Sequence, residues 1–419
     1  MRRRIVLVVS AFPKLSESFI AAKFSGLIES GWDAHVVCTA SETEEWRRLA
    51  AGPSERPLRR RVHVAWAHRP RWLAALFFVP AVLKTVLRNP RASLRYLVRG
   101  GRLFGLSVLR RFYLDAEIIG LAPDLVHFEF GSLAAGRMHV GELLGCRVVV
   151  SFRGYDLNFA GLEDPSYYDA VWKRADAIHV LGEDLWRQAQ RRGCPPARLH
   201  ALIPPAVDVS EFEPATREDA EAGTPQRPLR VLGVGRLSWK KGYDYALEAI
   251  GRLAEKGVRC QYRIVGDGED RSLVAFGRHQ YGLEECVELL GAQPRAEVRR
   301  QLEWADVFLH AAVSEGFCNA VVEAQAMALP VVCSDAGGLP ENVADGQTGF
   351  VIERRDGSAL AEKLEQLARD PVLRRQMGDR GRSRVQARFR LADQISAFDR
   401  LYGAVLGGQG GAVRVSSAV

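Results

Sequence analysis

Two carboxylates stand close together in one short stretch of the chain, residues 314–324, which reads S-E-G-F-C-N-A-V-V-E-A. Glu315 precedes Asn319, where we expect a helix to begin, and Glu323 lies one helical turn inside that helix. A helix N-terminus presents unpaired N–H groups and a partial positive charge, which suit a phosphate. Ionised carboxylates only accept hydrogen bonds, so beside such a seat they suit the hydroxyl groups of a sugar. The stretch predicts a site for a phosphorylated sugar; in the plainer interpretation, both glutamates are surface residues of an ordinary helix.

Cations and glycines follow other apolar runs of the same half of the chain. Arg236 and Lys241 lie five residues apart on the loop after the run 229–234, and Gly266 opens the glycine-rich loop after the run 261–265. Ligands of parallel α/β sheets bind at the carboxyl ends of the strands, so these groups should share one edge. Arg236 and Lys241 would then neutralise two leaving phosphates. Taken alone, either cation would be interpreted as a solvated surface charge.

The elements that position these groups alternate between strands and helices. The apolar run at 3–10 predicts a strand, residues 19–29 predict a helix that ends before Gly31, and 32–40 predict a second strand. Strand, helix and strand at this spacing form a βαβ unit. Because the pattern recurs in the second half, the sequence predicts an α/β protein with two Rossmann-like domains.

Composition indicates where the domains meet. A stretch rich in proline and glycine at 209–228 is the expected linker between a first domain, 1–208, and a second domain, 229–390. Residues 391–406 predict a last helix, and 407–419 predict a disordered tail.

The motif E-G-F-x-N-x-x-x-E-A at 315–324, followed by G-G-L-P at 337–340, resembles the signature of family 4 glycosyltransferases. The loop F-P-K-L-S-E-S-F at 12–19 is similar to the opening loop of transferases that build bacterial exopolysaccharides, including colanic-acid-type enzymes. The resemblance implies the GT-B fold, in which two Rossmann-like α/β domains face each other across a cleft. It also implies that the helix at 391–406 crosses back to the first domain.

Two motifs of the first domain depart from the family pattern. V-H-F-E-F-G at 126–131 looks like the family's H-x-H-F-G, with Glu129 in place of the second histidine. S-F-R-G-Y-D at 151–156 looks like F-H-G-x-D, with Arg153 in place of histidine. Arginine stays protonated and cannot act as a base, although it can donate to a sugar or a phosphate. The alternative interpretation is a structural substitution in an altered site.

The resemblance implies that a hexose passes, with retention of configuration, from a nucleotide sugar (UDP-sugar first, GDP-sugar next) to a glycan or lipid-linked acceptor. It implies no covalent enzyme nucleophile, and the leaving phosphate oxygen takes the acceptor proton. The implied catalytic residues are Glu315, Lys241, Arg236 and Arg153. The implied donor-binding residues, among which Glu323 holds the ribose diol and Leu290–Gly291 contact the base, are Gly235, Arg236, Lys241, Gly266, Asp267, Leu290, Gly291, Glu315, Gly316, Phe317, Cys318, Asn319 and Glu323. The implied acceptor side consists of Ser16, Glu17, His127, Glu129, Gly154 and Asp156.

The chain contains no D-x-D motif, so we expect no metal-bridged diphosphate and no cofactor besides the nucleotide-sugar substrate. The seven cysteines are scattered without C-x-x-C or paired spacing. This pattern favours reduced thiols in a cytosolic protein over a disulfide framework or a zinc site.

A basic insert spans residues 56–114 and contains no acidic residue. Its cations alternate with aromatic and aliphatic residues in helical-looking segments, and they predict contact with an anionic membrane surface or with the diphosphate of a lipid acceptor. In the alternative interpretation, the apolar residues pack inside the first domain and the arginines are solvated around it. No nucleic-acid-binding motif accompanies the insert. The fourteen cations are Arg56, Arg59, Arg60, Arg61, Arg69, Arg71, Lys84, Arg88, Arg91, Arg95, Arg99, Arg102, Arg110 and Arg111.

No apolar run approaches the roughly 20 residues that span a bilayer. The start, M-R-R-R-I-V-L-V-V-S-A-F, runs into polar residues rather than a cleavage site, so it predicts a strand and not a signal peptide. We expect a cytoplasmic protein that lies peripherally on the inner face of the plasma membrane.

Two other functions fit a nucleotide-sugar site. A nucleotide-sugar 2-epimerase of the same fold would release UDP and an altered sugar without any acceptor. A non-catalytic sugar-nucleotide binder is suggested by Glu129 and Arg153. The motif G-R-L-x-x-x-K-G at 235–242 together with Glu315 and Glu323 favours the transferase.

Overall fold

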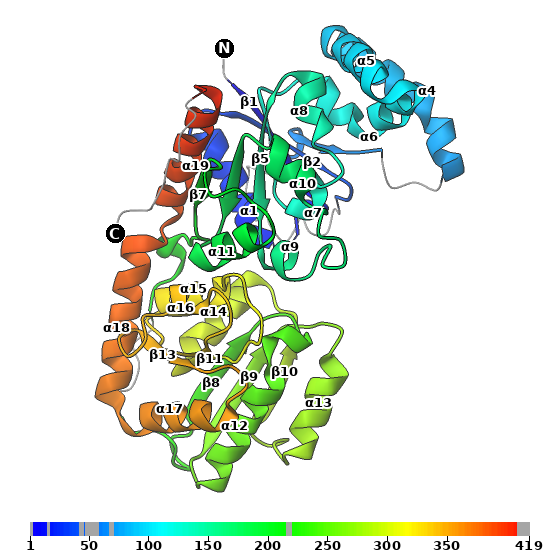
Figure 1. Cartoon of the computed structure of the whole chain (residues 1–419). Helices are drawn as coiled ribbons and strands as arrows, with labels where there is room; N and C mark the ends of the chain where they lie inside the picture. The colour runs from blue at the N-terminus through cyan, green and yellow to red at the C-terminus, as the bar shows by residue number, and fades with distance from the viewer. Residues whose placement is uncertain are drawn as a thin grey trace. The chain divides into compact units, whose positions relative to one another are not determined.

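The computed structural model describes residues 3–14, 17–41, 46, 58–66, 71–214 and 220–408. Contacts divide the chain into two compact units, whose helices and strands are labelled in Figure 1. The first unit consists of Met1–Leu181, Trp186–Ile203 and Ile395–Ser416, and the second consists of Gly182–Leu185, Pro204–Gln394 and Ser417–Val419.

A parallel sheet forms the centre of the first unit. Within the described residues its strands lie in the order β3-β2-β1-β4-β5-β6-β7, and every neighbouring pair is parallel. The chain reverses its direction of winding between β1 and β4, as in Rossmann-like sheets. The strands are β1 (Arg4–Val8), β2 (Asp33–Cys38), β3 (Val62–Val64), β4 (Leu125–Phe128), β5 (Arg147–Phe152), β6 (Ala177–Val180) and β7 (His200–Leu202).

Helices join these strands. Most are short, and α1 begins one residue before the predicted start at Phe19. They are α1 (Ser18–Glu29), α4 (Arg71–Arg88), α5 (Pro90–Phe104), α6 (Val108–Leu121), α7 (Gly131–Ala134), α8 (His139–Leu144), α9 (Gly154–Asn158), α10 (Asp169–Arg174) and α11 (Glu183–Arg191), with the 3-10 turn η2 (Gly105–Ser107).

The last helix, α19 (Leu391–Leu406), contributes to the core of the first unit. Phe398, Leu401 and Tyr402 are buried in the same cluster as residues of β1 and α1, including Ile5 and Phe24. Apolar positions three and four residues apart place these side chains on one helix face. The helix thus joins the core formed by the start of the chain.

A second parallel sheet forms the centre of the second unit. Its strands lie in the order β10-β9-β8-β11-β12-β13 in the part of the chain that the structure describes. They are β8 (Leu229–Val234), β9 (Cys260–Val265), β10 (Val287–Gly291), β11 (Val307–His310), β12 (Val331–Ser334) and β13 (Gly349–Ile352). The helices are α12 (Tyr243–Glu255), α13 (Arg271–Gln280), α14 (Arg295–Trp304), α15 (Asn319–Ala326), α16 (Leu339–Asn342), α17 (Gly357–Arg369) and α18 (Pro371–Arg388), with the 3-10 turns η3 (Val209–Glu211) and η4 (Trp239–Lys241). Both units are therefore α/β, as predicted, and α15 begins at Asn319, as the sequence predicted.

The basic insert is not wholly helical. Residues 62–64 form β3, the edge strand of the first sheet, and they pair with β2. The prediction missed this strand because its three residues are partly exposed and too short to show a clear alternation. The rest of the described insert forms α4 and α5 and enters α6, which continues past residue 114.

Two acids immediately after the insert bond to its helices, and one of them, Glu117, compensates part of its charge. Glu117 accepts hydrogen bonds from Lys84 Nζ at 2.8 Å and from Arg88 at 3.4 Å. Asp115 is buried and accepts from Tyr96 Oη at 2.7 Å and from Arg137 Nε at 3.0 Å. These bonds tie α4 and α5 to α6. The absence of acids between 56 and 114 therefore overstates the unpaired charge of the folded insert.

We find no described helix with the length and continuous apolar character that a bilayer span demands. The predicted disordered tail lies mostly outside the described residues, since only 407 and 408 of it are described.

Candidate active site

The predicted phosphate seat lies at the start of α15 in the second unit. Cys318 is the N-cap residue, and the helix begins at Asn319 as expected. Glu315 lies on the loop between β11 and α15, and its side chain is only slightly exposed. A carboxylate oxygen of Glu315 accepts a hydrogen bond from Lys241 Nζ and lies 3.2 Å from His310 Nε2. Sequence motifs far apart in the chain thus meet in one charged cluster.

Electrostatics hold this cluster in its ionised form. Burial alone would raise the pKa of Glu315, but Lys241 and His310 bring it down to about 2. Burial likewise opposes the charge of His310, yet Cys318 and Glu315 raise its pKa to about 9. At neutral pH the carboxylate therefore lies between two cations. The ammonium of Lys241 and the ring of His310 can therefore also attract an anionic ligand group.

Glycines let the loops of the site approach one another closely. Gly266 has φ +148°, and a Cβ there would collide with the carbonyl oxygen of Gly235. Gly337 has φ +55°, and a Cβ there would collide with the carbonyl oxygen of Glu315. These conformations strongly favour glycine. The G-G-L-P turn therefore packs directly on the loop that carries Glu315.

Asn342 fixes the backbone at the start of α15. Its Oδ1 accepts from the Cys318 N–H at 3.3 Å, and its Nδ2 donates to the Cys318 carbonyl at 3.2 Å. Asn342 is completely buried. Phe317 is also buried, and its ring packs edge-on against Phe389. These buried contacts hold the loop and the start of α15 in place, while Glu315 and Asn319 remain partly exposed.

Glu323 lies in the second turn of α15 and is partly buried. Burial raises its pKa to about 7, with Arg295 lowering it and Glu211 raising it by smaller amounts. Arg295 and Glu211 form an ion pair at 2.7 Å. A carboxyl that is desolvated to this degree gains from hydroxyl donors, which is what the predicted ribose contact would provide.

The remaining predicted donor residues lie at the carboxyl ends of the strands of the second sheet. Arg236 follows β8 and is exposed, and Asp267 follows β9 and is also exposed. The Gly291 carbonyl at the end of β10 accepts from the Gly266 N–H at 2.9 Å. Leu290 is partly buried, and its carbonyl accepts from Gln293 Nε2 at 2.6 Å. Gly235 lies on the loop after β8, and Gly316 lies on the loop between β11 and α15.

One set of side chains in the described part of the chain could hold a metal ion. The ligand atoms of His310, Glu315 and Cys318 all lie within 4.8 Å of one another. Nitrogen, oxygen and sulfur ligands together suit zinc. A dication would have to displace the Lys241 ammonium from Glu315. Metal independence remains a prediction, and this cluster is where it should be tested.

In the first unit, a buried network surrounds the H-F-E-F motif. His127 and Glu129 are fully buried, and Lys23 on α1 joins them. Lys23 Nζ donates to Glu129 Oε1 at 2.6 Å and lies 3.0 Å from His127 Nδ1. Tyr402 Oη on α19 lies 2.6 Å from the same His127 nitrogen. The two predicted acceptor residues therefore contact other side chains in the interior.

The proton positions in this network follow from the hydrogen bond between His179 and the backbone carbonyl of Ile203. His179 Nε2 lies 2.9 Å from the Ile203 carbonyl and must donate to it, so His179 Nδ1 accepts from the Ser151 hydroxyl at 2.7 Å. Ser151 in turn accepts from His127 Nε2 at 2.7 Å. His127 Nδ1 is left as the acceptor for Lys23 and Tyr402. Burial first, and then Lys23 and Arg153, hold the pKa of His127 well below its usual range, so the ring is neutral.

Arg153 replaces a histidine of the family pattern, and its charge is paired inside the same unit. It donates to Glu129 Oε2 at 3.1 Å, and its guanidinium lies 4.1 Å from the centre of the Phe19 ring. Burial alone would raise the pKa of Glu129, but Lys23 and Arg153 lower it overall. Glu129 and Arg153 thus depart from the family pattern as a matched pair of opposite charge.

Other predicted acceptor residues have structural partners. Asp156 is buried, and its oxygens accept from the backbone N–H groups of Ser132 at 2.9 Å and Arg153 at 3.0 Å. Gly154 begins α9. Glu17 pairs with Lys14 at 2.5 Å. Ser16 lies outside the described residues.

Sequence reasoning missed Lys23, His310 and Asn342. His310 ends a buried strand beside Glu315, and its place at a strand end was a usable signal. Lys23 lies inside a helix, and Asn342 follows the G-G-L-P turn. Neither residue has a neighbour in sequence that reveals its partner.

Solved structures identify the fold. Sucrose-phosphate synthase from Thermosynechococcus elongatus has a TM-score of 0.71 at 18% identity, over 97% of this chain and 100% of that chain. Anabaena Alr3699/HepE in complex with UDP-glucose has a TM-score of 0.70 at 16% identity, over 96% of this chain and 99% of that chain. The predicted fold class is confirmed: the chain has the GT-B fold of glycosyltransferases, with two Rossmann-like units.

Sequence relatives identify the family. Residues 215–384 match the family described as "Glycosyl transferases group 1". The "Putative colanic acid biosynthesis glycosyltransferase WcaL" of Salmonella typhimurium is 31% identical over 386 residues, which cover 85% of this chain and 89% of the relative. The "Amylovoran biosynthesis glycosyltransferase AmsK" of Erwinia amylovora is 29% identical over 253 residues, 58% of this chain and 60% of the relative. The chain belongs to the group 1 glycosyl transferases, as its motifs predicted.

The buried pair Lys23–Glu129 generates the first testable prediction. Lys23→Met leaves only Arg153, among the described cations, bonded to the buried Glu129 carboxylate, so the free energy of unfolding should fall by about 3 kcal/mol. Lys14→Met is the matched control, because it breaks the more exposed Lys14–Glu17 pair and should cost about 0–1 kcal/mol. Urea unfolding followed by circular dichroism measures both. Equal stabilities of the two variants would contradict the network described here.

Proposed function

We propose that this glycosyltransferase moves a hexose from a nucleotide sugar to a glycan or lipid-linked acceptor in polysaccharide biosynthesis. The observation that carries the proposal is the cluster of Lys241, Glu315 and His310 beside the start of α15. UDP is the preferred nucleotide and GDP the next. The named activities of the colanic acid and amylovoran relatives support a role in polysaccharide synthesis.

In the proposed mechanism, the diphosphate lies at the amino end of α15, where N–H groups and the helix dipole favour negative charge. Lys241 and the exposed Arg236 stabilise the charge that develops on the leaving phosphate. Glu315 orients the hexose, and Glu323 accepts hydrogen bonds from the ribose hydroxyls. No residue of the cluster is needed as a covalent nucleophile.

The transfer retains the anomeric configuration. The acceptor oxygen bonds to the anomeric carbon as the bond from that carbon to the phosphate oxygen breaks. The acceptor proton passes to the leaving phosphate, so the nucleoside diphosphate departs without a base from the enzyme. Arg153 on the acceptor side donates hydrogen bonds and cannot take this proton, since its guanidinium stays charged. Glu129, which also accepts from Lys23, holds Arg153 in position from inside the first unit.

The same proposal places the protein on the cytoplasmic face of an anionic membrane, through α4, α5 and α6. Large apolar side chains of these helices are exposed to solvent, although such residues are normally scattered singly over a surface. Cations at exposed positions accompany them, including Arg91 and Arg102 on α5. Their exposed apolar residues are Leu76, Val79, Leu83, Leu87, Leu94, Val98, Leu103 and Leu109, with Leu106 in the turn η2.

Removal of Lys241 tests the donor site. Lys241→Ala should lower kcat by about 10²–10³-fold, because a contact to charge that develops in the transition state is worth about 2.7–4 kcal/mol. Glu323→Ala should mainly raise KM for the nucleotide sugar, since its contact is present in the ground state as well. Release of nucleotide from a panel of nucleotide sugars, with and without lipid extract, is the measurement. Lys256→Ala, which breaks only a surface pair with Glu365, is the control.

Near-normal turnover of Lys241→Ala would contradict the assignment. Release of nucleotide together with an altered free sugar, in the absence of any acceptor, would instead identify an epimerase. Binding of nucleotide sugar without turnover on any acceptor would identify a non-catalytic binder.

Metal independence is the second prediction from this mechanism. The positive charge that a bridging metal would otherwise supply comes from Lys241, Arg236 and the amino end of α15. EDTA should therefore leave most of the activity intact. The assay compares turnover before and after EDTA at constant ionic strength. Complete loss that manganese or magnesium restores would show that the phosphate chemistry is assigned wrongly.

A further inference from the structure

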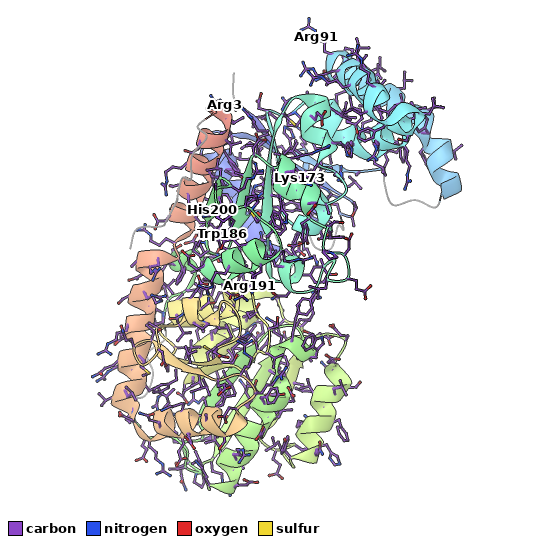
Figure 2. All side chains as sticks on the ribbon, viewed as in Figure 1. Arg3, Arg91, Lys173, Trp186, Arg191 and His200 are labelled. Atoms are coloured by element: carbon purple, nitrogen blue, oxygen red, sulfur yellow. The ribbon has the colours of Figure 1, made fainter. Side chains whose placement is uncertain are left out.

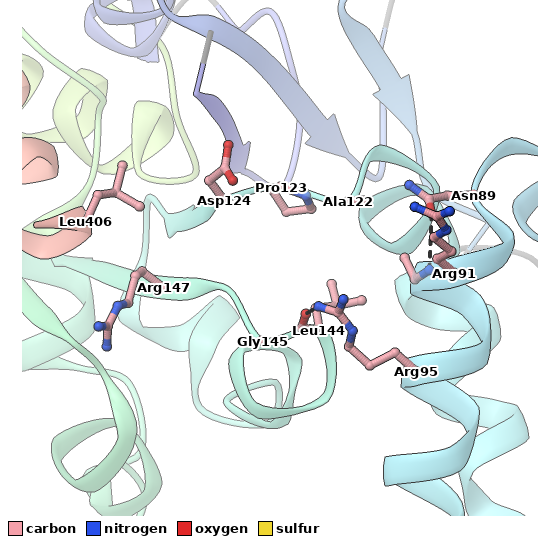
Figure 3. A pocket seen from close by; sticks show the side chains of 11 residues that line it. Asn89, Arg91, Arg95, Ala122, Pro123, Asp124, Leu144, Gly145, Arg147 and Leu406 are labelled. Atoms are coloured by element: carbon pink, nitrogen blue, oxygen red, sulfur yellow. Dashed lines mark hydrogen bonds between the residues drawn. The ribbon is translucent and has the colours of Figure 1, made fainter. Parts of the chain in front are cut away.

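A basic cavity lies in the first unit beside α5, away from the carboxyl ends of the strands. Its volume is about 420 Å³. Asp124 and Arg147 stand at the amino ends of β4 and β5, so the cavity lies at the edge of the sheet opposite to the one that carries Arg153. Figure 3 shows the side chains that line it. They are Asn89, Arg91, Ala92, Arg95, Ala122, Pro123, Asp124, Leu144, Gly145, Arg147 and Leu406.

Three guanidinium groups and one carboxylate line the cavity. Arg95 donates to the Leu144 carbonyl at 2.8 Å, which uses one of its five N–H groups. Arg147 donates to Asp176 at 2.7 Å. Asp124 accepts from the backbone N–H of Arg4 at 2.7 Å. The Arg91 side chain has no hydrogen-bond partner among the described residues, and Figure 2 shows this residue at the start of α5. Donors therefore outnumber acceptors in the cavity.

The exposed part of α5 divides into two neighbouring rows. Arg91, Arg95, Arg99 and Arg102 recur every three or four residues and form one row along the helix. Leu94 and Val98 form the adjacent row and are 65% and 46% exposed. The opposite face, with Ala92, Ser93, Tyr96 and Gly100, is buried. An apolar row beside a row of arginines is typical of helices that lie in a membrane interface.

We propose that the cavity holds the phosphate of an anionic phospholipid when α5 lies on a bilayer. This inference rests on the membrane contact in the proposed function and names the group that the contact recognises. Guanidinium groups bind phosphate oxygens through paired N–H donors, and Arg91 and Arg95 still have such donors free for a ligand. On α5 the cavity is lined by Arg91, Ala92 and Arg95, and the apolar row of Leu94 and Val98 adjoins the same arginines, so a headgroup bound there would have its acyl chains beyond the arginine row, on the side of Leu94 and Val98.

The charge balance supports a phosphate diester over a neutral headgroup. Asp124 repels anions, but it shares the cavity lining with three arginines, and its carboxylate accepts a hydrogen bond from the Arg4 backbone N–H. Arg95 and Arg99 also donate to the Leu144 and Glu142 carbonyls at the end of α8. These bonds fix the guanidinium of Arg95 at the wall of the cavity before any ligand arrives, which lowers the cost of binding.

Vesicle co-sedimentation with Arg91→Ala and Arg102→Ala tests the proposal. Both arginines are exposed, both lie in the same row of α5, and neither side chain forms a hydrogen bond or ion pair with a described residue, but only Arg91 lines the cavity. Vesicles of phosphatidylcholine and phosphatidylglycerol in equal parts are compared with pure phosphatidylcholine. Arg102→Ala should weaken binding about five-fold, as expected for one cation near an anionic surface. Arg91→Ala should weaken vesicle binding about ten-fold more than Arg102→Ala does, because the Arg91 variant also loses a charged hydrogen bond to the phosphate.

Equal losses in the two variants would overturn the proposal and leave only diffuse attraction. A wild-type protein that transfers sugar but ignores the anionic vesicles would overturn the inference and the membrane contact together, while the glycosyl transfer would stand. A last experiment adds inorganic phosphate at constant ionic strength and measures the melting temperature. If it raises the melting temperature of the wild type but not of Arg91→Ala, while vesicle binding of the two variants is equal, the cavity binds free phosphate rather than lipid.

Discussion

The ion cluster of Lys241, Glu315 and His310 is the constraint on which the candidate active site depends. A carboxylate in a largely buried position is stable only with paired cations; here Lys241 comes from the loop after β8, and His310 ends β11, the strand that precedes Glu315. Gly337 lets the G-G-L-P turn pack on the backbone of Glu315, and Gly266 lets the loop after β9 pack on the loop after β8 at Gly235. Backbone conformation at two glycines therefore shapes the loops that surround the cluster.

The first unit also contains a buried carboxylate, and different residues pair its charge. Glu129 and Arg153 depart from the histidines of the family pattern, and together with Lys23 they form a buried group in which each charge has an opposite partner. Tyr402 adds α19 to the same network. A change at the carboxyl end of the first sheet is thus compensated within its own core, and only Arg153 retains partial exposure.

Much of the second unit could be predicted from sequence because its signals are local. The start of α15 at Asn319 follows from a motif in which apolar period, cap and carboxylates lie within ten residues. Lys23 could not be predicted, because a lysine inside an amphipathic helix looks like a solvated charge until β4 is placed beside it. The edge strand β3 was also missed, because its three residues are too few to show an alternating pattern and only the pairing with β2 defines the strand. Contacts between residues far apart in the sequence therefore explain both Lys23 and β3.

A structure of the protein with UDP bound would show directly whether the second unit binds a nucleotide sugar through the start of α15. We expect the diphosphate to contact the first N–H groups of α15 and Lys241 Nζ, and the ribose hydroxyls to donate to Glu323. A nucleotide bound elsewhere, or one whose ribose makes no contact with Glu323, would contradict this expectation.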